Sequence, residues 1–175
     1  ITLPHTPFVE PLTVLHQWQG ICYYKKKITI TPEEAKKHIW IEFEGAMHLA
    51  DVWINGKHVM QHAGGYTPFV VDATGLLKTG KENELLVRLD NRNNSLIPPG
   101  KPLETLDFCY YGGIYRNVHL IAKADVHITH PILDGHPAGA GIFITYPKVS
   151  QELSVVDAKT EIKNTSDKEK VVELR

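Results

Sequence analysis

The stretch "LADVWINGKHVM", residues 49–60, decides the fold class of this sequence. Apolar residues recur at every second position from Ala50 to Ile54, which is the period of a β-strand with one buried face. Asn55 and Gly56 follow, and both tolerate the positive φ that a type I′ turn requires. A second strand-like run begins directly after them, so the sequence predicts a tight β-hairpin.

The same period of two occurs in "HIWIEFE" (38–44), "ELLVRLD" (84–90) and "RNVHLIAK" (116–123). One helix-like motif, "TPEEAKKHI" (31–39), offers Thr31 as an N-cap, but its length suffices for only a single helical turn. Many short strands separated by Gly, Pro and Asn turns, without regular helical patterns between them, indicate an all-β protein. We therefore expect a β-sandwich.

Two regions depart from this rhythm. Residues 91–107, "NRNNSLIPPGKPLETLD", are long, rich in Pro and Asn and without a periodic pattern, which favours an ordered functional loop. Residues 124–175 carry three or four strand-like runs, too few to close an independent sandwich. We expect the chain to be cut through a second domain, with its last strand continuing to Arg175.

Composition excludes several classes of function. The 175 residues contain 19 basic and 20 acidic side chains, so no general positive field attracts nucleic acid. Lys25, Lys26 and Lys27 lie within a strand-like run and indicate a solvated strand edge. No run of eighteen apolar residues is present, so the sequence predicts no membrane-spanning helix. Cys22 and Cys109 form no disulfide framework, and we expect buried free thiols.

Three motifs in fixed order identify a resemblance. The hairpin "DVWING" (51–56), the turn "GGYTPF" (64–69) and the segment "GGIYRNV" (112–118) resemble the N-terminal sugar-binding domain of glycoside hydrolase family 2. The resemblance covers residues 1–123. It implies that these form a jelly-roll-like β-sandwich, and that residues 124–175 begin an immunoglobulin-like β-sandwich. The family's third domain, a catalytic (β/α) barrel, has no counterpart in these residues.

The resemblance also implies a site. In β-galactosidases and β-glucuronidases of the family, an acid before the aromatic-Gly-Ile segment reaches the active-site pocket, and the matching residue here is Asp107. A carboxylate accepts strong hydrogen bonds from sugar hydroxyls. Tyr110 and Tyr111 offer flat faces suited either to a sugar ring or to packing against the barrel. His5, in "LPHT", is a further candidate for the pocket, although Thr6 and Pro7 stand where the family commonly has Asp and Trp.

No catalytic residue is expected within the chain. A retaining glycosidase needs two carboxyl groups about 5 Å apart, and nothing in the sequence fixes Glu104 and Asp107 at that separation or raises one pKa against the other. We therefore expect this portion alone to be inactive. The parent enzyme is expected to hydrolyse terminal β-linked sugars, galactosides first, with β-glucuronidase and β-mannosidase as alternatives.

Neither a metal nor a cofactor is expected. His127 and His130 lie three positions apart, on opposite faces of a strand. "HPAGAGIF" (136–143) lacks the third Gly and the following helix of a dinucleotide site. One visible carboxylate is too few to predict a metal ion beside Asp107. Arg116, within its strand, is expected to pair with a buried acid or with carbonyl groups.

Two further interpretations remain open. One is an autonomous carbohydrate-binding module with aromatic side chains stacked on sugar. The other is a buttress that docks on the barrel through an apolar surface that includes parts of residues 94–111, a surface that can also bring two copies together. Because many bacterial relatives that act on polysaccharide-derived substrates are exported, we expect a periplasmic or secreted protein.

Overall fold

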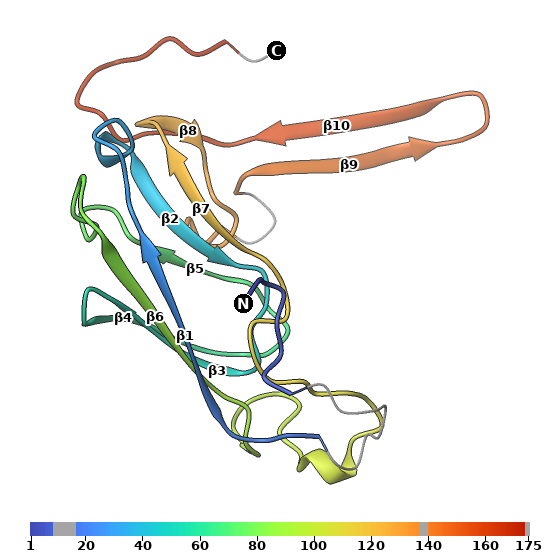
Figure 1. The fold of residues 1–175 in the computed structure, drawn as a ribbon. Helices are drawn as coiled ribbons and strands as arrows, with labels where there is room; N and C mark the ends of the chain where they lie inside the picture. The colour runs from blue at the N-terminus through green and yellow to red at the C-terminus, as the bar shows by residue number, and fades with distance from the viewer. Residues whose placement is uncertain (9–16, 137–139, 174–175) are drawn as a thin grey trace. The chain divides into compact units, whose positions relative to one another are not determined.

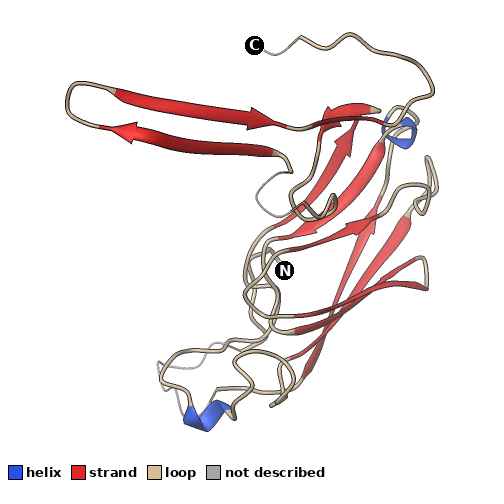
Figure 2. Cartoon of the chain, turned by 180° about the vertical axis from the view of Figure 1, so that it is seen from behind, coloured by secondary structure: helices blue, strands red, loops and turns tan. Residues whose placement is uncertain are grey.

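The computed structural model describes residues 1–8, 17–136 and 140–173. The chain forms two compact units, Ile1–Ala122 and Lys123–Arg175 (Figure 1). Each unit is built from strands, and the helical content of the described residues is limited to short turns (Figure 2). The all-β class expected from the period-two pattern is therefore confirmed.

The first unit is a sandwich of two antiparallel sheets, as Figure 1 shows. The four-stranded sheet has the order β1-β6-β3-β4, with bounds β1 Ile21–Ile28, β6 Asn83–Asp90, β3 Leu49–Ile54 and β4 Lys57–Ala63. The three-stranded sheet has the order β5-β2-β7, with bounds β5 Phe69–Asp72, β2 His38–Phe43 and β7 Val118–Lys123.

The predicted hairpin joins β3 to β4. Asn55 and Gly56 have φ angles of 51° and 81°, as a type I′ turn requires. The Asn55 side chain also fastens the turn to β6, because its Oδ1 accepts the backbone N–H of Glu84 at 3.1 Å and its Nδ2 donates to Asn83 Oδ1 at 2.9 Å. The hairpin is thus tied into the sheet at its tip as well as along its strands.

The core fills the space between the two sheets. Every second residue of each central strand points inward, so Ala50, Val52 and Ile54 of β3 meet Ile39, Ile41 and Phe43 of β2 in one buried cluster. Phe43 stacks on Phe69 with ring centroids 4.5 Å apart. The alternation in the sequence therefore identified the inward-facing residues correctly.

The helix-like motif is a single 3₁₀ turn, η2 (Glu34–Lys36), as expected. Thr31 and Glu34 cap it reciprocally: Thr31 Oγ1 accepts the Glu34 N–H at 3.2 Å, and Glu34 Oε2 accepts the Thr31 N–H at 2.7 Å. Across the residues that the structure describes, no helix is long and apolar enough to cross a membrane.

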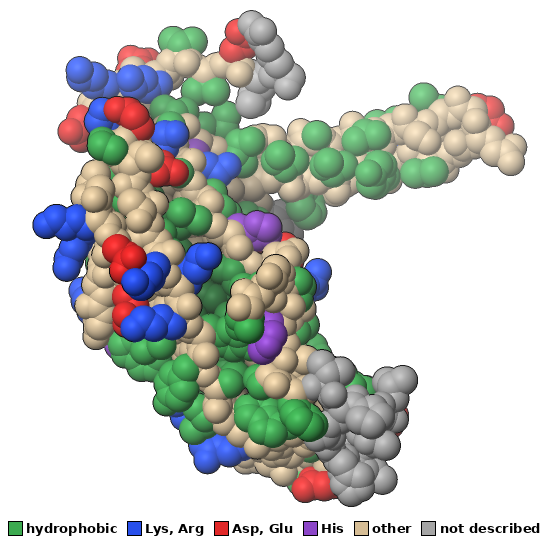
Figure 3. Space-filling model, in the orientation of Figure 1, with side chains coloured by type: hydrophobic (Ala, Val, Ile, Leu, Met, Phe, Trp, Pro, Cys, Tyr) green, Lys and Arg blue, Asp and Glu red, His purple; other side chains and the backbone are tan. Residues whose placement is uncertain are grey.

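The second unit consists of two small antiparallel pairs. Strand β8 (Val126–Ile128) pairs with β11 (Ile162–Asn164), and β9 (Ile142–Val149) pairs with β10 (Ser154–Thr160). Hydrophobic side chains lie exposed along the β9–β10 hairpin (Figure 3). The prediction of a further strand after Asn164 is wrong for residues 165–173, none of which lies in a strand. No neighbouring strand pairs with them there, and an extended segment needs such a partner to form a ladder.

Candidate functional site

The long loop after β6 is held by a small apolar cluster of its own. Leu103 and Leu106 pack with Met47 and Tyr110, and all four are buried. A short 3₁₀ helix, η3 (Leu103–Thr105), begins at the first leucine, and Leu106 follows directly as its C-cap. The loop is thus anchored, as expected for an ordered segment, even though its sequence has no periodic pattern.

Tyr110 is one of these anchors. It is 5% exposed, and its hydroxyl pairs with Nδ1 of His48, which is also buried. Burial raises the pKa of Tyr110, so the hydroxyl keeps its proton, whereas burial lowers the pKa of His48. This position favours packing over sugar stacking, and a sugar contact by Tyr110 stays a prediction.

Two residues that the sequence analysis did not single out hold the segment before the glycine pair. Gln17 is buried; its Oε1 accepts the Tyr110 N–H and its Nε2 donates to the Phe108 carbonyl at 3.5 Å. His48 continues the inward face of Ala50. A polar side chain at a position with buried periodicity needs an internal partner, and that was the available signal for His48. Nothing in the sequence around Gln17 marks its role.

Asp107 lies between these anchors and is exposed. Its carboxylate makes no hydrogen bond or ion pair with any residue in the described ranges. The neighbouring Phe108 ring is 41% exposed. Buried Leu106 precedes Asp107 and buried Tyr110 follows it, so the carboxylate faces outward from a fixed piece of backbone.

His5 lies against the end of the same segment. The backbone N–H of His5 donates to the Ile114 carbonyl at 2.8 Å, and its ring Nδ1 lies 2.9 Å from the Tyr24 hydroxyl. Gly113, at φ 102°, permits this close approach, because a Cβ there would lie 2.5 Å from the Tyr24 hydroxyl and 2.7 Å from the His5 carbonyl oxygen. The structure therefore brings together the two motifs that carry the predicted site residues.

The remaining candidates are placed differently. Tyr111 is half-buried next to the glycine pair. Arg116 pairs with an acid, as expected, but Glu44 is not buried: the Arg116 Nε–Glu44 Oε2 distance is 3.8 Å and the Glu44 side chain is 32% exposed. The expectation of a buried partner is wrong, because Glu44 lies beyond the end of β2, where the chain turns toward solvent. Cys22 and Cys109 are free thiols, as expected, but both are only partly buried.

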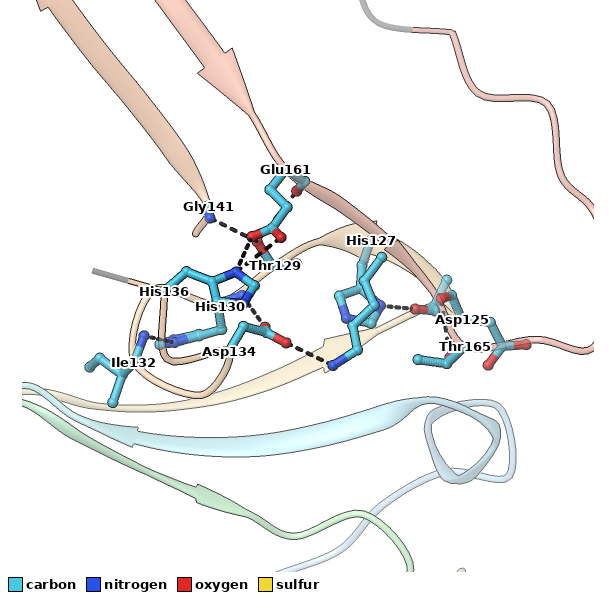
Figure 4. Close-up of polar contacts among 12 residues, drawn as sticks. Asp125, His127, Thr129, His130, Ile132, Asp134, His136, Gly141, Glu161 and Thr165 are labelled. Atoms are coloured by element: carbon cyan, nitrogen blue, oxygen red, sulfur yellow. Dashed lines mark hydrogen bonds and ion pairs between the residues drawn. The ribbon is translucent and has the colours of Figure 1, made fainter. Parts of the chain in front are cut away.

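The second unit contains a polar cluster around Glu161 (Figure 4). Glu161 accepts a hydrogen bond from Thr129 Oγ1 at 3.0 Å and lies 3.1 Å from His136 Nδ1, while Thr129 Oγ1 also accepts the Gly141 N–H at 2.8 Å. Asp134 pairs with Lys163 at 2.7 Å. These bonds join the ends of β8, β9 and β11, so the cluster has a structural explanation.

The histidines of this unit do not form a metal site. His127 Nδ1 lies 2.7 Å from the Ala124 carbonyl oxygen, and His130 Nδ1 accepts the Ile132 N–H at 3.2 Å. Within residues 1–8, 17–136 and 140–173, no group of three His, Cys, Asp or Glu side chains is arranged to hold a metal ion.

A groove of about 700 Å³ opens between the two sheets of the first unit. Its walls include Phe43, Val87, Ile114 and Val118, with lysines of β1 at its rim. Sugar recognition needs several convergent polar groups as well as apolar surface. The groove is lined mostly by apolar side chains and contains none of Asp107, Tyr110 and Tyr111, so we do not assign the sugar site to it.

Comparison with known proteins decides the family. Residues 6–124 match the domain described as "Glycosyl hydrolases family 2, sugar binding domain". The chain belongs to glycoside hydrolase family 2. The resemblance deduced from the hairpin, the Gly-Gly-Tyr turn and the Gly-Gly-Ile segment is therefore confirmed.

Relatives in this family carry two activities in their names. A β-glucuronidase of Bacteroides fragilis is 34% identical over 170 residues, which cover 94% of this chain and 23% of that protein. A β-galactosidase of Thermoanaerobacter pseudethanolicus is 36% identical over 167 residues, covering 93% and 22% of the two chains. This chain thus spans less than a quarter of the length of these relatives.

Solved structures agree with the fold. The structure of Bacteroides uniformis β-glucuronidase 2 covalently bound to cyclophellitol-6-carboxylate aziridine matches with a TM-score of 0.76 and 32% identity, covering 95% of this chain and 19% of that one. A putative β-galactosidase from Bacteroides fragilis matches with a TM-score of 0.77 and 29% identity, covering 95% and 24%.

Proposed function

We propose that this chain is the non-catalytic N-terminal part of a retaining family 2 glycosidase, and that Asp107 supplies one wall of the active-site pocket. The observation that carries the proposal is the outward carboxylate of Asp107 on a segment fixed at both ends. A carboxylate without an internal partner is available to accept hydrogen bonds from sugar hydroxyls. The hydrogen bonds of Tyr110 with Gln17 and with His48 hold the backbone that follows Asp107 in place.

The parent enzyme acts on terminal β-linked sugars under this proposal, either galactosides or glucuronides. The named activities of the relatives support both sugars. Asp107 contributes recognition rather than bond cleavage, because the acid/base and nucleophile of a retaining mechanism form a pair about 5 Å apart. We accordingly propose that the chain alone hydrolyses no glycoside.

Docking on the catalytic domain follows from the same surface. Leu96 is 91% exposed and Phe108 is 41% exposed, both within or beside the anchored loop. Large apolar side chains on one loop are typical of a contact surface. We propose that this loop packs against the barrel, which places Asp107 at the pocket. We also propose that residues 124–175 begin the immunoglobulin-like sandwich that forms the family's second domain.

The test is an Asp107→Asn substitution in the parent enzyme, with kcat/KM measured on p-nitrophenyl β-galactoside and p-nitrophenyl β-glucuronide. Loss of a hydrogen bond to a charged group costs about 1.5–3 kcal/mol, so kcat/KM should fall roughly 10- to 150-fold on the preferred substrate. Glu104→Gln, which neutralises the exposed acid three residues earlier, is the matched control and should change kcat/KM less than about twofold. Equal values for Asp107→Asn and the unmodified enzyme would refute the proposal.

A further inference from the structure

A polar hollow lies where β6 ends and the long loop begins. It encloses about 560 Å³, within the range of small-molecule sites. The lining residues come from the segment before β1, the start of β3 and the end of β6, and are Gln19, His48, Leu49, Asp90, Arg92, Asn93 and Asn94. None of the predicted sugar-contact residues is among them.

The walls of the hollow are held firmly together. The Asn91 side chain bridges to the neighbouring segment, since its Oδ1 accepts the Gly20 N–H at 2.8 Å and its Nδ2 donates to the Trp18 carbonyl at 2.9 Å. The backbone N–H of Asn91 donates to the Gly20 carbonyl at 3.2 Å. Residues 18–20 and 91–93 therefore form two sides of one rigid frame.

Three amide side chains in the hollow are oriented by the backbone. The oxygen of Gln19 accepts the Asn93 N–H at 3.1 Å, that of Asn93 accepts the Leu103 N–H at 2.9 Å, and that of Asn94 accepts the Leu96 N–H at 2.9 Å. A backbone N–H needs an acceptor, so these bonds fix which end of each amide is oxygen. None of the three NH₂ groups donates a hydrogen bond to another residue that the structure describes.

The charged side chains beside the amides likewise offer N–H donors to the hollow. Arg92 donates through Nε and Nη2 to Asp90, at 2.9 and 2.6 Å, and its Nη1 donates to no residue of the described part of the chain. Both oxygens of Asp90 are occupied, one by Arg92 and the other by Arg92 and Arg88. His48 is engaged with Tyr110. The hollow therefore offers more donors than acceptors, because each amide oxygen already accepts one backbone N–H while its NH₂ group stays available.

We propose that this hollow binds an oxyanion, a carboxylate or a sulfate group such as an acidic sugar carries. A set of free N–H donors matches a group that only accepts hydrogen bonds. A neutral sugar hydroxyl also needs acceptors, and a cation needs oxygen ligands. Both fit this hollow less well, because each amide oxygen already accepts one internal hydrogen bond and both oxygens of Asp90 accept from arginine. The site is separate from Asp107 and does not depend on the function proposed for that residue.

The test is NMR titration of the ¹⁵N-labelled chain, because side-chain NH₂ groups give resonances of their own. The probes are sodium glucuronate, sodium sulfate and methyl β-glucoside, each compared at matched ionic strength with sodium chloride. We expect glucuronate or sulfate to shift the side-chain NH₂ signals of Gln19, Asn93 and Asn94 along saturating curves, and methyl β-glucoside to leave them in place. A response to glucuronate alone identifies carboxylate as the oxyanion. A response to sulfate alone identifies sulfate.

Two variants sharpen the result. Asn94→Asp and Gln19→Glu keep the oxygen that accepts the backbone N–H, but replace free donors with negative charge, so binding should weaken about tenfold or more. Gln151→Glu introduces the same charge at an exposed position of the second unit and should bind like the unmodified chain. No saturating shift with either oxyanion, equal shifts with methyl β-glucoside, or undiminished binding in Asn94→Asp would each overturn the proposal.

Discussion

Asn83 offers the sharpest test of what stabilises the sandwich. Its side chain is fully buried and makes five hydrogen bonds. Oδ1 accepts from the Lys78 N–H at 2.7 Å and from Asn55 Nδ2 at 2.9 Å, while Nδ2 donates to the carbonyls of Ile28, Lys78 and Lys81. One amide thus joins the end of β1, the turn before β6 and the hairpin tip.

Asn83→Ala removes all five bonds and leaves backbone groups without their partners. Each hydrogen bond contributes about 1 kcal/mol net, and each buried group left unsatisfied costs about 1–3 kcal/mol. Water entering the vacated space offsets part of this, so we expect a loss of about 3–5 kcal/mol in the free energy of unfolding. That is a large share of the roughly 5–15 kcal/mol of a typical domain.

The assay is equilibrium urea unfolding followed by tryptophan fluorescence. All three tryptophans, Trp18, Trp40 and Trp53, belong to the first unit, so the signal reports on that unit alone. The midpoint should fall by about 2 M with an unchanged slope. Asn117→Ala is the control, because its exposed Nδ2 makes one bond, at 3.3 Å to Glu44, and should cost less than about 1 kcal/mol. A loss below about 1 kcal/mol for Asn83→Ala would refute the reasoning.

Two further predictions concern titration. Hydrogen bonds from Arg92 lower the pKa of Asp90, and bonds from Gln61, His58 and Arg88 lower that of Asp51 against the effect of burial. The folded state then binds fewer protons than the unfolded state, so stability should be full above the ordinary pKa of 3.8 and decline as pH falls through and below it. Urea midpoints between pH 5 and 2.5 measure this decline, Arg88→Gln should flatten it, and a flat profile in the unmodified chain would contradict it. Burial raises the pKa of Cys22 to about 11. At pH 8 its alkylation by iodoacetamide, followed by peptide mass spectrometry, should therefore be on the order of 100-fold slower than that of glutathione; unfolding in urea should restore the rate, and equal rates in the folded chain would exclude the shift.

The sequence predicted those features that local geometry dictates. The Asn55-Gly56 turn follows from the φ values that two adjacent residues tolerate, and the inward faces of β2, β3 and β6 follow from the period of two. The cap of Thr31 on η2 also lies within four residues. In each of these cases the determining contacts are close along the chain, or repeat with a fixed period.

Contacts between distant residues without a period were not predictable in this way. The cluster of Met47 with Leu103 and Tyr110 joins positions more than fifty residues apart, and the leucines lie in a segment that reads as irregular. Gln17 meets Tyr110 across 93 positions. The expected last strand fails for a related reason, since strand propensity has no effect where a pairing edge is lacking. Where Asp107 would act was suggested by the family resemblance, whereas its anchoring became visible only in three dimensions.

The small apolar cluster beneath the long loop has a consequence for the conformational entropy of binding. An irregular loop that is free in solution loses about 1–2 kcal/mol for each residue whose backbone becomes fixed when a ligand arrives. Here Leu103, Leu106 and Tyr110 are buried in the folded chain without any ligand. The ordering of the backbone on both sides of Asp107 therefore occurs during folding. Any partner that meets this carboxylate, sugar or neighbouring domain, keeps more of its interaction energy as affinity.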